Sequence, residues 1–218
     1  MKLLAYATAT LFMTIGIATA ARAENPAHLK QLLETKSCEG CDLTGAQLQR
    51  LDLSGANLRR ADLSGADLTG ANLNEANFNR AILVEANLTD TSLIAAKLHG
   101  ADLTRTNLRN ANLTLAGMVI ADLTDANLRG ANLVGANLES ADLTGANLQN
   151  VRQSVANLGQ VRLQEGSLYG FDISGVNLRD TDLTGTNLSG ADLTASDLAG
   201  ANLDDANLFN TNLMNARR

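Results

Sequence analysis

The sequence predicts an all-β solenoid whose coils are squares of twenty residues, and three observations predict it. Every fifth residue from Leu43 to Leu213 is a predicted core position, here called position i, and other positions of a repeat are counted from it. Position i occurs 35 times without insertion and is Leu 31 times. Glycine is frequent two residues later, at i+2, where a tight turn needs positive φ. The only proline, Pro26, lies before the repeats, so each repeat residue keeps an N–H to bond with a neighbouring coil.

A period of five excludes the ordinary secondary structures. On an α-helix, apolar positions five residues apart drift around the surface and leave no single buried face. In a flat strand, an odd period places successive leucines on opposite sides. A chain that turns a corner once per repeat points i−2 and i inward, and four corners close a square. Stacked squares then bury a column of leucine as a solenoid core.

The stretch from Ala121 to Asn150, ADLTDANLRGANLVGANLESADLTGANLQN, repeats the phrase A(D/N)LXX six times. This phrase resembles the signature of the pentapeptide-repeat family, and the match covers residues 41–215. The resemblance implies a right-handed quadrilateral parallel β-helix. With four repeats per coil and coils about 4.8 Å apart, we expect roughly nine coils in a rod about 40 Å long. Residues 216–218 would form a short C-terminal tail.

Residues 1–23 have a different composition and predict a secretory signal peptide. Lys2 precedes an apolar run from Leu3 to Ile17, and Ala21-Arg22-Ala23 offers a cleavage site. An uncleaved anchor and cleavage after Ala20 are alternatives. Removing Lys2 and Arg22 changes the net charge from −6 to −8. We therefore expect an exported, acidic, soluble protein with no membrane insertion after cleavage.

Residues 24–40 predict a capping helix and a connector to the first coil. Asn25-Pro26 suits a helix N-cap and first turn, and Leu29, Leu32 and Leu33 follow at helical spacing. A helix here would cover the open end of the solenoid, with His28 packed in the cap or on its surface. Cys38 and Cys41 are the only cysteines, which predicts a disulfide in an exported protein. A redox motif or a zinc site is disfavoured, because a βαβ unit and two further ligands are lacking.

Residues twenty apart should stack, so the chain can be analysed as columns. One column at i−1 is acidic and is broken by Ile82 and Arg162; we expect a solvated polar face, with cation binding or an electrostatic partner surface as alternatives. Its members are Asp42, Asp62, Asp102, Asp122, Asp142 and Asp182.

Two further groups depart from the pattern. Apolar side chains cluster at outward positions near one corner and form a candidate partner surface. Its members are Ile94, Leu115, Val119, Ile120 and Val134, with Val155 one coil further. The second group is an irregular coil, in which Gln153 enters the core column between Val151 and Phe171. Because a buried unpaired amide costs about 1 to 3 kcal/mol, Gln153 either bulges outward or bonds within the core.

The sequence predicts a non-catalytic scaffold or protein-interaction module without cofactor or metal. The repeat Ser and Thr residues lack a partner base, and His99 stands alone. An acidic rod that mimics DNA and binds a topoisomerase is the alternative, which the signal peptide disfavours. The acidic balance also disfavours direct nucleic-acid binding.

The N-terminal stretch LLETKSCEGCDLTGA resembles exported pentapeptide-repeat proteins of photosynthetic bacteria, which implies a periplasm or thylakoid lumen. We expect an unidentified protein partner, and the terminal coil, near Phe209 and Met214, is a candidate for homodimerisation.

Overall fold

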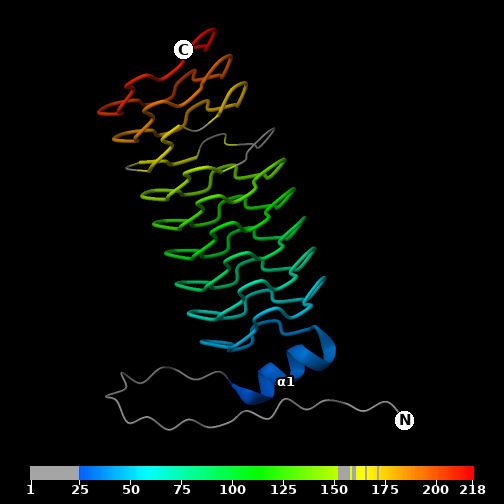
Figure 1. Cartoon of the computed structure of the whole chain (residues 1–218). Helices are drawn as coiled ribbons and strands as arrows, with labels where there is room; N and C mark the ends of the chain where they lie inside the picture. Colours follow the sequence, from blue (N-terminus) through cyan, green and yellow to red (C-terminus); the bar gives the residue numbers. More distant parts are fainter. Residues whose placement is uncertain (1–24, 152–157, 159–160, 165, 171) are drawn as a thin grey trace, which may run out of the picture.

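The chain forms a rod of stacked coils that rises from an N-terminal helix to the C-terminus at the opposite end (Figure 1). The structure is a computed structural model and describes residues 25–151, 158, 161–164, 166–170 and 172–218. The predicted signal segment and the predicted position of Gln153 lie outside these residues, as do Phe171 and Val155. The described residues confirm the predicted architecture of β-coils with a short N-terminal helix.

Parallel β-bridges between residues twenty apart fix the register of the coils. They run from Ser37 paired with Asn57 to Asp197 paired with Arg217, and each falls at position i−1. Within the described residues the bridges are isolated and no continuous strand forms. The physical reason is that each repeat stays extended for only a few residues before it turns. The predicted twenty-residue square is thus confirmed.

The interior is filled by the side chains at i and i−2, as the sequence predicted. Leu residues at i are almost completely buried along the described rod up to Leu198, and Phe78, Met118 and Ile173 are 0% exposed in the same columns. Alanine at i−2 is buried beside them. Where threonine replaces this alanine, its hydroxyl donates to a core carbonyl, as Thr106 Oγ1 does to Leu83 O at 2.7 Å. Buried polar groups in this core are therefore paired.

The corners lie at i+2, and the backbone there is left-handed. Gly45 has φ 70° and Gly135 has φ 67°. Many corners are not glycine; asparagine, aspartate and arginine occupy several, and Leu115 and Ile120 occupy two. Glycine tolerates this region without cost, and Asn and Asp tolerate it better than other residues. The sequence thus predicted where the turns lie and the type of residue at most of them.

Four of the five N–H groups in a regular repeat bond to other backbone groups. The N–H at i−2 donates to the carbonyl of the preceding core residue, as Ala46 does to Leu43 at 3.0 Å. The N–H at i−1 donates to the coil before, and those at i and i+2 donate to the coil after. The remaining N–H, at i+1, donates to no backbone carbonyl.

The side chain at i−1 supplies the missing acceptor. In every described repeat with Asp or Asn at i−1, its Oδ1 atom accepts from the N–H two residues later, at N···O distances of 2.9 to 3.3 Å. This contact is an Asx-turn. Asp or Asn in the repeat phrase therefore has a structural role, because it pairs the one N–H that the backbone leaves without an acceptor.

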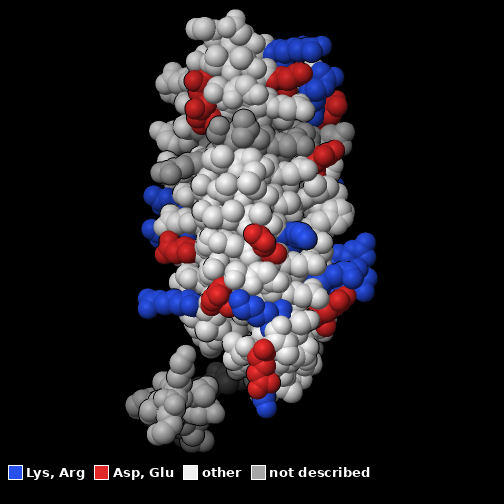
Figure 2. Space-filling view, turned by 90° about the vertical axis from the view of Figure 1, so that its right-hand side faces the viewer, with Lys and Arg blue, Asp and Glu red and all other residues white. Residues whose placement is uncertain are grey.

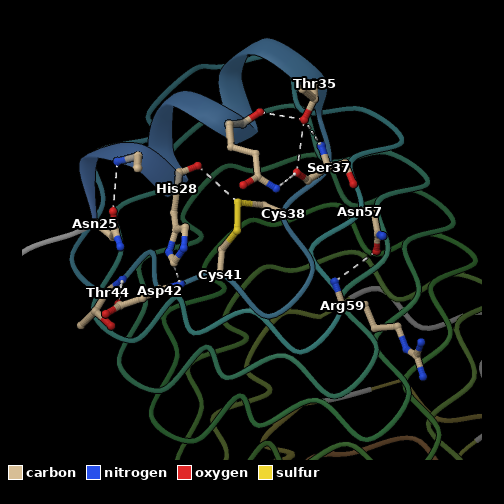
Figure 3. The surroundings of a disulfide bond; sticks show 12 residues. Asn25, His28, Thr35, Ser37, Cys38, Cys41, Asp42, Thr44, Asn57 and Arg59 are labelled. Carbon is tan, nitrogen blue, oxygen red and sulfur yellow. Dashed lines mark hydrogen bonds between the residues drawn. A yellow bond between two sulfur atoms is a disulfide. The ribbon is translucent and has the colours of Figure 1, made fainter.

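Helix α1 (Pro26–Thr35) covers the N-terminal end of the rod (Figures 1 and 3). Asn25 is its N-cap, and the Asn25 side chain accepts from Ala27 N at 3.0 Å. Leu32 is fully buried against the first coil and Leu29 is partly buried. Leu33, which the helical spacing also placed in the cap, is instead 52% exposed. Neighbouring helical residues point about 100° apart, so with Leu32 turned directly toward the coil Leu33 lies at the edge of the apolar face.

Backbone and side-chain bonds join α1 to the coil edge. His28 Nδ1 accepts from Asp42 N at 3.0 Å, and Asn25 N donates to Asp42 O at 3.4 Å. These bonds occupy groups that a preceding coil would otherwise pair. Figure 3 shows the sulfur pair beside them: the Sγ atoms of Cys38 and Cys41 lie 2.09 Å apart, at disulfide distance. Hydrogen bonds thus hold α1 to the coil edge, and the cysteine pair predicted from the sequence lies at disulfide distance just beyond the helix.

Replacing Asn77 tests the role of the side chain at i−1. Asn77→Ala removes the acceptor for Asn79 N, a bond of 3.1 Å. We expect the free energy of unfolding to fall by about 1 kcal/mol, because the N–H loses its partner. Urea denaturation followed by circular dichroism measures the change. Asn77→Asp, which keeps the acceptor, should stay close to the wild type; equal losses in both variants would show that Oδ1 is not what matters.

Candidate interaction surface

The acidic column predicted from the sequence is assembled as expected. Parallel bridges place Asp42 beside Asp62, join Asp102, Asp122 and Asp142 in succession, and insert Ile82 and Arg162 at the two breaks. Arg162 Nη1 donates to Asp142 Oδ2 at 3.1 Å. The column is therefore a continuous geometric feature whose charge is partly offset within the chain.

Each carboxylate in this column also serves a turn. Asp102 Oδ1 accepts from both the backbone N–H and the hydroxyl of Thr104, at 3.0 and 2.6 Å. The same pair of bonds recurs at Asp62, Asp142 and Asp182. Among the described residues, no group of three or more His, Cys, Asp or Glu side chains could hold a metal ion. The column thus has a structural use that the sequence analysis missed, although the pairing of Asp at i−1 with Thr or Ser at i+1 carried the signal.

Hydrogen bonds lower the pKa of several aspartates at i−1. For Asp182 the hydroxyl of Thr184 has the largest effect, followed by the Thr184 N–H, and desolvation opposes them. Gln164 and Arg162 lower the Asp182 pKa further. The pKa values of Asp52 and Asp192 are lowered in the same way, mainly by the hydroxyls of Ser54 and Thr194. These carboxylates are held in the ionised form, in which they accept hydrogen bonds.

The apolar cluster is only partly exposed. Leu115 and Ile120 are 62% and 54% exposed, whereas Ile94, Val119 and Val134 are half-buried. Thr114 occupies the place between Ile94 and Val134 in the stack. The exposed apolar surface is therefore narrower than the sequence predicted and is centred on the single segment from Leu115 to Ile120.

Leu115 and Ile120 both lie at corners with left-handed backbone, with φ 59° and 51°. Ile120 is the only β-branched residue among the described residues with positive φ, a conformation that branched side chains disfavour. Gly135 in the adjoining coil makes room for Leu115, because a Cβ there would lie 2.8 Å from Leu115 Cδ2. A Cβ at Gly100 would lie 3.8 Å from Ile120 Cδ1, which is an ordinary contact distance. This segment thus departs from the repeat in both polarity and backbone preference.

Other predicted positions have mixed outcomes. Val151 is buried at its inward site, while Gln153 and Phe171 lie outside the described residues. Phe209 and Met214 are exposed on the last coil. No helix within the described part of the chain is long and apolar enough to cross a membrane. On the face shown in Figure 2, acidic and basic side chains are interspersed.

Repeat pattern, coil register and capped end together define a solenoid protein built from five-residue repeats. The family model described as pentapeptide repeats, in 8 copies, matches residues 37–74, 71–110, 121–152, 156–194 and 187–217. The chain therefore belongs to the pentapeptide repeat family. Proteins of this family are generally non-catalytic. No curated protein sequence matches the chain significantly.

Solved structures of cyanobacterial proteins are similar to this chain. HetL, a pentapeptide repeat protein involved in heterocyst differentiation regulation in Nostoc sp. strain PCC 7120, is 35% identical with a TM-score of 0.73; the match covers 83% of this chain and 84% of HetL. Rfr23 from Cyanothece 51142 is 33% identical over 60% of this chain and 92% of its own, with a TM-score of 0.39. A pentapeptide repeat protein from the Arabidopsis thaliana thylakoid lumen is 26% identical over 61% and 69%, with a TM-score of 0.24.

Acid should destabilise the solenoid through its turn aspartates. Because the pKa values of Asp52, Asp182 and Asp192 are lowered in the folded chain, the unfolded chain binds more protons near the ordinary Asp pKa. The stabilisation is present above that pKa and is lost as the pH falls through the folded values, so we expect the free energy of unfolding to decline from about pH 5 downward. Urea titrations across this range measure it. Asp182→Asn should show a shallower decline, and an unchanged slope would contradict the assignment.

Relieving the backbone at Ile120 should stabilise the protein. Asn tolerates left-handed backbone better than a β-branched residue, so Ile120→Asn should raise the free energy of unfolding by about 1 kcal/mol. Thermal and urea denaturation measure the change. Asn210→Asp, at another exposed left-handed corner, is the control and should have little effect. A loss of stability in Ile120→Asn would show that the contact of Ile120 with Gly100 outweighs the backbone cost.

Proposed function

We propose that this protein is a non-catalytic interaction module that binds another protein through the segment from Leu115 to Ile120. The observation that carries the proposal is the pair of exposed apolar side chains, Leu115 and Ile120, on successive corners of one coil. Such corners elsewhere bear mostly glycine or polar residues. Apolar side chains held exposed at a disfavoured backbone are typical of a contact surface.

The related protein HetL supports a role in regulation by binding, since HetL is involved in heterocyst differentiation regulation. We also propose that the protein acts after export, in a periplasm or thylakoid lumen. The apolar run from Leu3 to Ile17 and the small residues that end at Ala23 support export.

Mimicry of DNA is the weaker candidate. The carboxylates of the acidic column accept turn hydrogen bonds, and Ile82 and Arg162 interrupt the column. The face shown in Figure 2 carries interspersed acidic and basic side chains, so it lacks the uniform negative potential of a duplex. A homodimer through the terminal coil is a further proposal, which the exposure of Phe209 and Met214 supports.

Affinity capture from the native cells tests the proposal. The tagged full-length protein is compared with Leu115→Asn/Ile120→Asn, whose asparagines suit the left-handed corners and leave the fold intact. We expect a partner that the wild type retains and the double variant loses by at least tenfold. Ile82→Asn, which removes an exposed apolar side chain from another face, is the matched control and should retain the partner.

Circular dichroism of each variant confirms that it is folded. Equal capture by wild type and double variant, or capture of no protein, would contradict the proposed surface. An untagged second copy, co-captured by the wild type and lost in Phe209→Asn, would report the homodimer.

A further inference from the structure

Seven described repeats after Leu43 lack the Asx acceptor, and two of them are compensated by the coil before. In the repeats with Ser92 and Lys97 at i−1, an asparagine of the preceding coil replaces the missing acceptor. Asn74 Oδ1 accepts from Ile94 N at 2.9 Å, and Asn79 Oδ1 accepts from His99 N at 3.0 Å. The N–H at i+1 donates to no described group where i−1 is Gln47, Ile82, Gly117, Arg162 or Ser167. A neighbouring coil therefore supplies the acceptor in two of these repeats, and no described group supplies it in the other five.

Val119 differs from the other four because its repeat has glycine at i−1. Gly117 is the only glycine at that position in the 35 repeats. The other four repeats carry Gln, Ile, Arg or Ser at i−1, whereas Gly117 has no side chain that could stand beside the Val119 N–H.

The backbone does not require glycine at this position. A Cβ built on Gly117 meets no atom within 4 Å, and φ is outside the left-handed region. Gly117 forms the usual parallel bridges, to Lys97 in the coil before and to Asn137 in the coil after. An Asp or Asn would fit here as it does in the regular repeats. A side chain at position 117 would therefore enter open space, as the repeat phrase requires of Asp or Asn.

Two features of the surroundings indicate what could fill this space. Leu115 and Ile120 stand exposed at the corners on either side of Gly117 and Val119, so an occupant meets apolar surface on both flanks. Lys97, bridged directly to Gly117, is exposed and forms no ion pair with a described residue. A cation next to an open N–H favours a carboxylate over a neutral acceptor.

We propose that this site binds a partner segment that contains an Asp or Glu next to an apolar residue. The carboxylate accepts from the Val119 N–H in the place of the absent Asx side chain and pairs with Lys97. The adjacent apolar side chain packs against Leu115 or Ile120. The partner thereby completes the turn that this repeat leaves incomplete. This inference rests on the proposed function and specifies which chemistry the interaction surface recognises.

Selection from a displayed library of random peptides of about 12 residues, on the immobilised full-length protein, tests the site. We expect the enriched peptides to share an acidic residue beside Leu, Ile, Met or Phe. The dissociation constant of one synthetic peptide is then measured for the wild type and for three variants. Gly117→Asn should bind at least tenfold more weakly, because its own side chain occupies the Val119 N–H. Lys97→Gln should also weaken binding about tenfold, the factor that a charge-assisted hydrogen bond supports.

Gly117→Ala is the matched control, since it adds a Cβ without an acceptor and should change affinity less than threefold. Loss of fold does not explain a loss in Gly117→Asn, because this variant gains an intramolecular hydrogen bond. Hydrogen exchange at the Val119 amide gives an independent measurement: exchange should slow in Gly117→Asn and in the wild-type complex with the peptide.

Enriched peptides without an acidic residue, no enriched peptide at all, or undiminished binding to Gly117→Asn would overturn the proposal. Capture of the native partner tests the interaction surface separately from the completion of the turn at Val119. If the partner is lost by Leu115→Asn/Ile120→Asn but retained by Gly117→Asn, the interaction surface stands and the completion of the turn is wrong.

Discussion

The hydrogen bond from the N–H at i+1 to the side chain at i−1 is the constraint that sets Asp or Asn in the repeat phrase. Stacked coils can pair the other N–H groups of a repeat with backbone carbonyls, but this one points away from both neighbouring coils. A short side chain with an oxygen two atoms beyond Cβ reaches it, and only Asp and Asn have that geometry. The repeat phrase is thus set by a backbone donor as much as by the leucine core.

This constraint also explains the charge of the protein. Either Asp or Asn satisfies the turn, so the net charge of −6 can vary from repeat to repeat without loss of the fold. The Asp side chains gain a second donor from Thr or Ser at i+1, as Asp102 does from Thr104 at 2.6 Å. Negative charge on the rod is therefore a property of how its corners are made. Acidity alone is weak evidence for a partner that binds anions or cations.

The sequence predicted most of the fold because its constraints are periodic. The five-residue spacing of leucine predicted the coil register, glycine predicted the left-handed corners, and Asn25-Pro26 predicted the start of α1. Contacts between specific side chains were not predictable in the same way. The exposure of Leu33 depends on how α1 is rotated, and the bond from Ile94 N to Asn74 joins residues of two different coils. The Val119 N–H without an acceptor could have been predicted from Gly117, but only once the role of the side chain at i−1 was known.

Asn74 and Asn79 have a consequence for how such a chain can evolve. Each accepts a bond from the repeat twenty residues later, so the absence of an Asx side chain at Ser92 and at Lys97 costs that repeat little. A substitution at Asn79 would therefore harm a repeat in a different coil, whereas the same substitution in a coil followed by a regular repeat would not. Neutral drift in this solenoid is coupled along its columns, and the order in which residues change decides which changes the rod can accept.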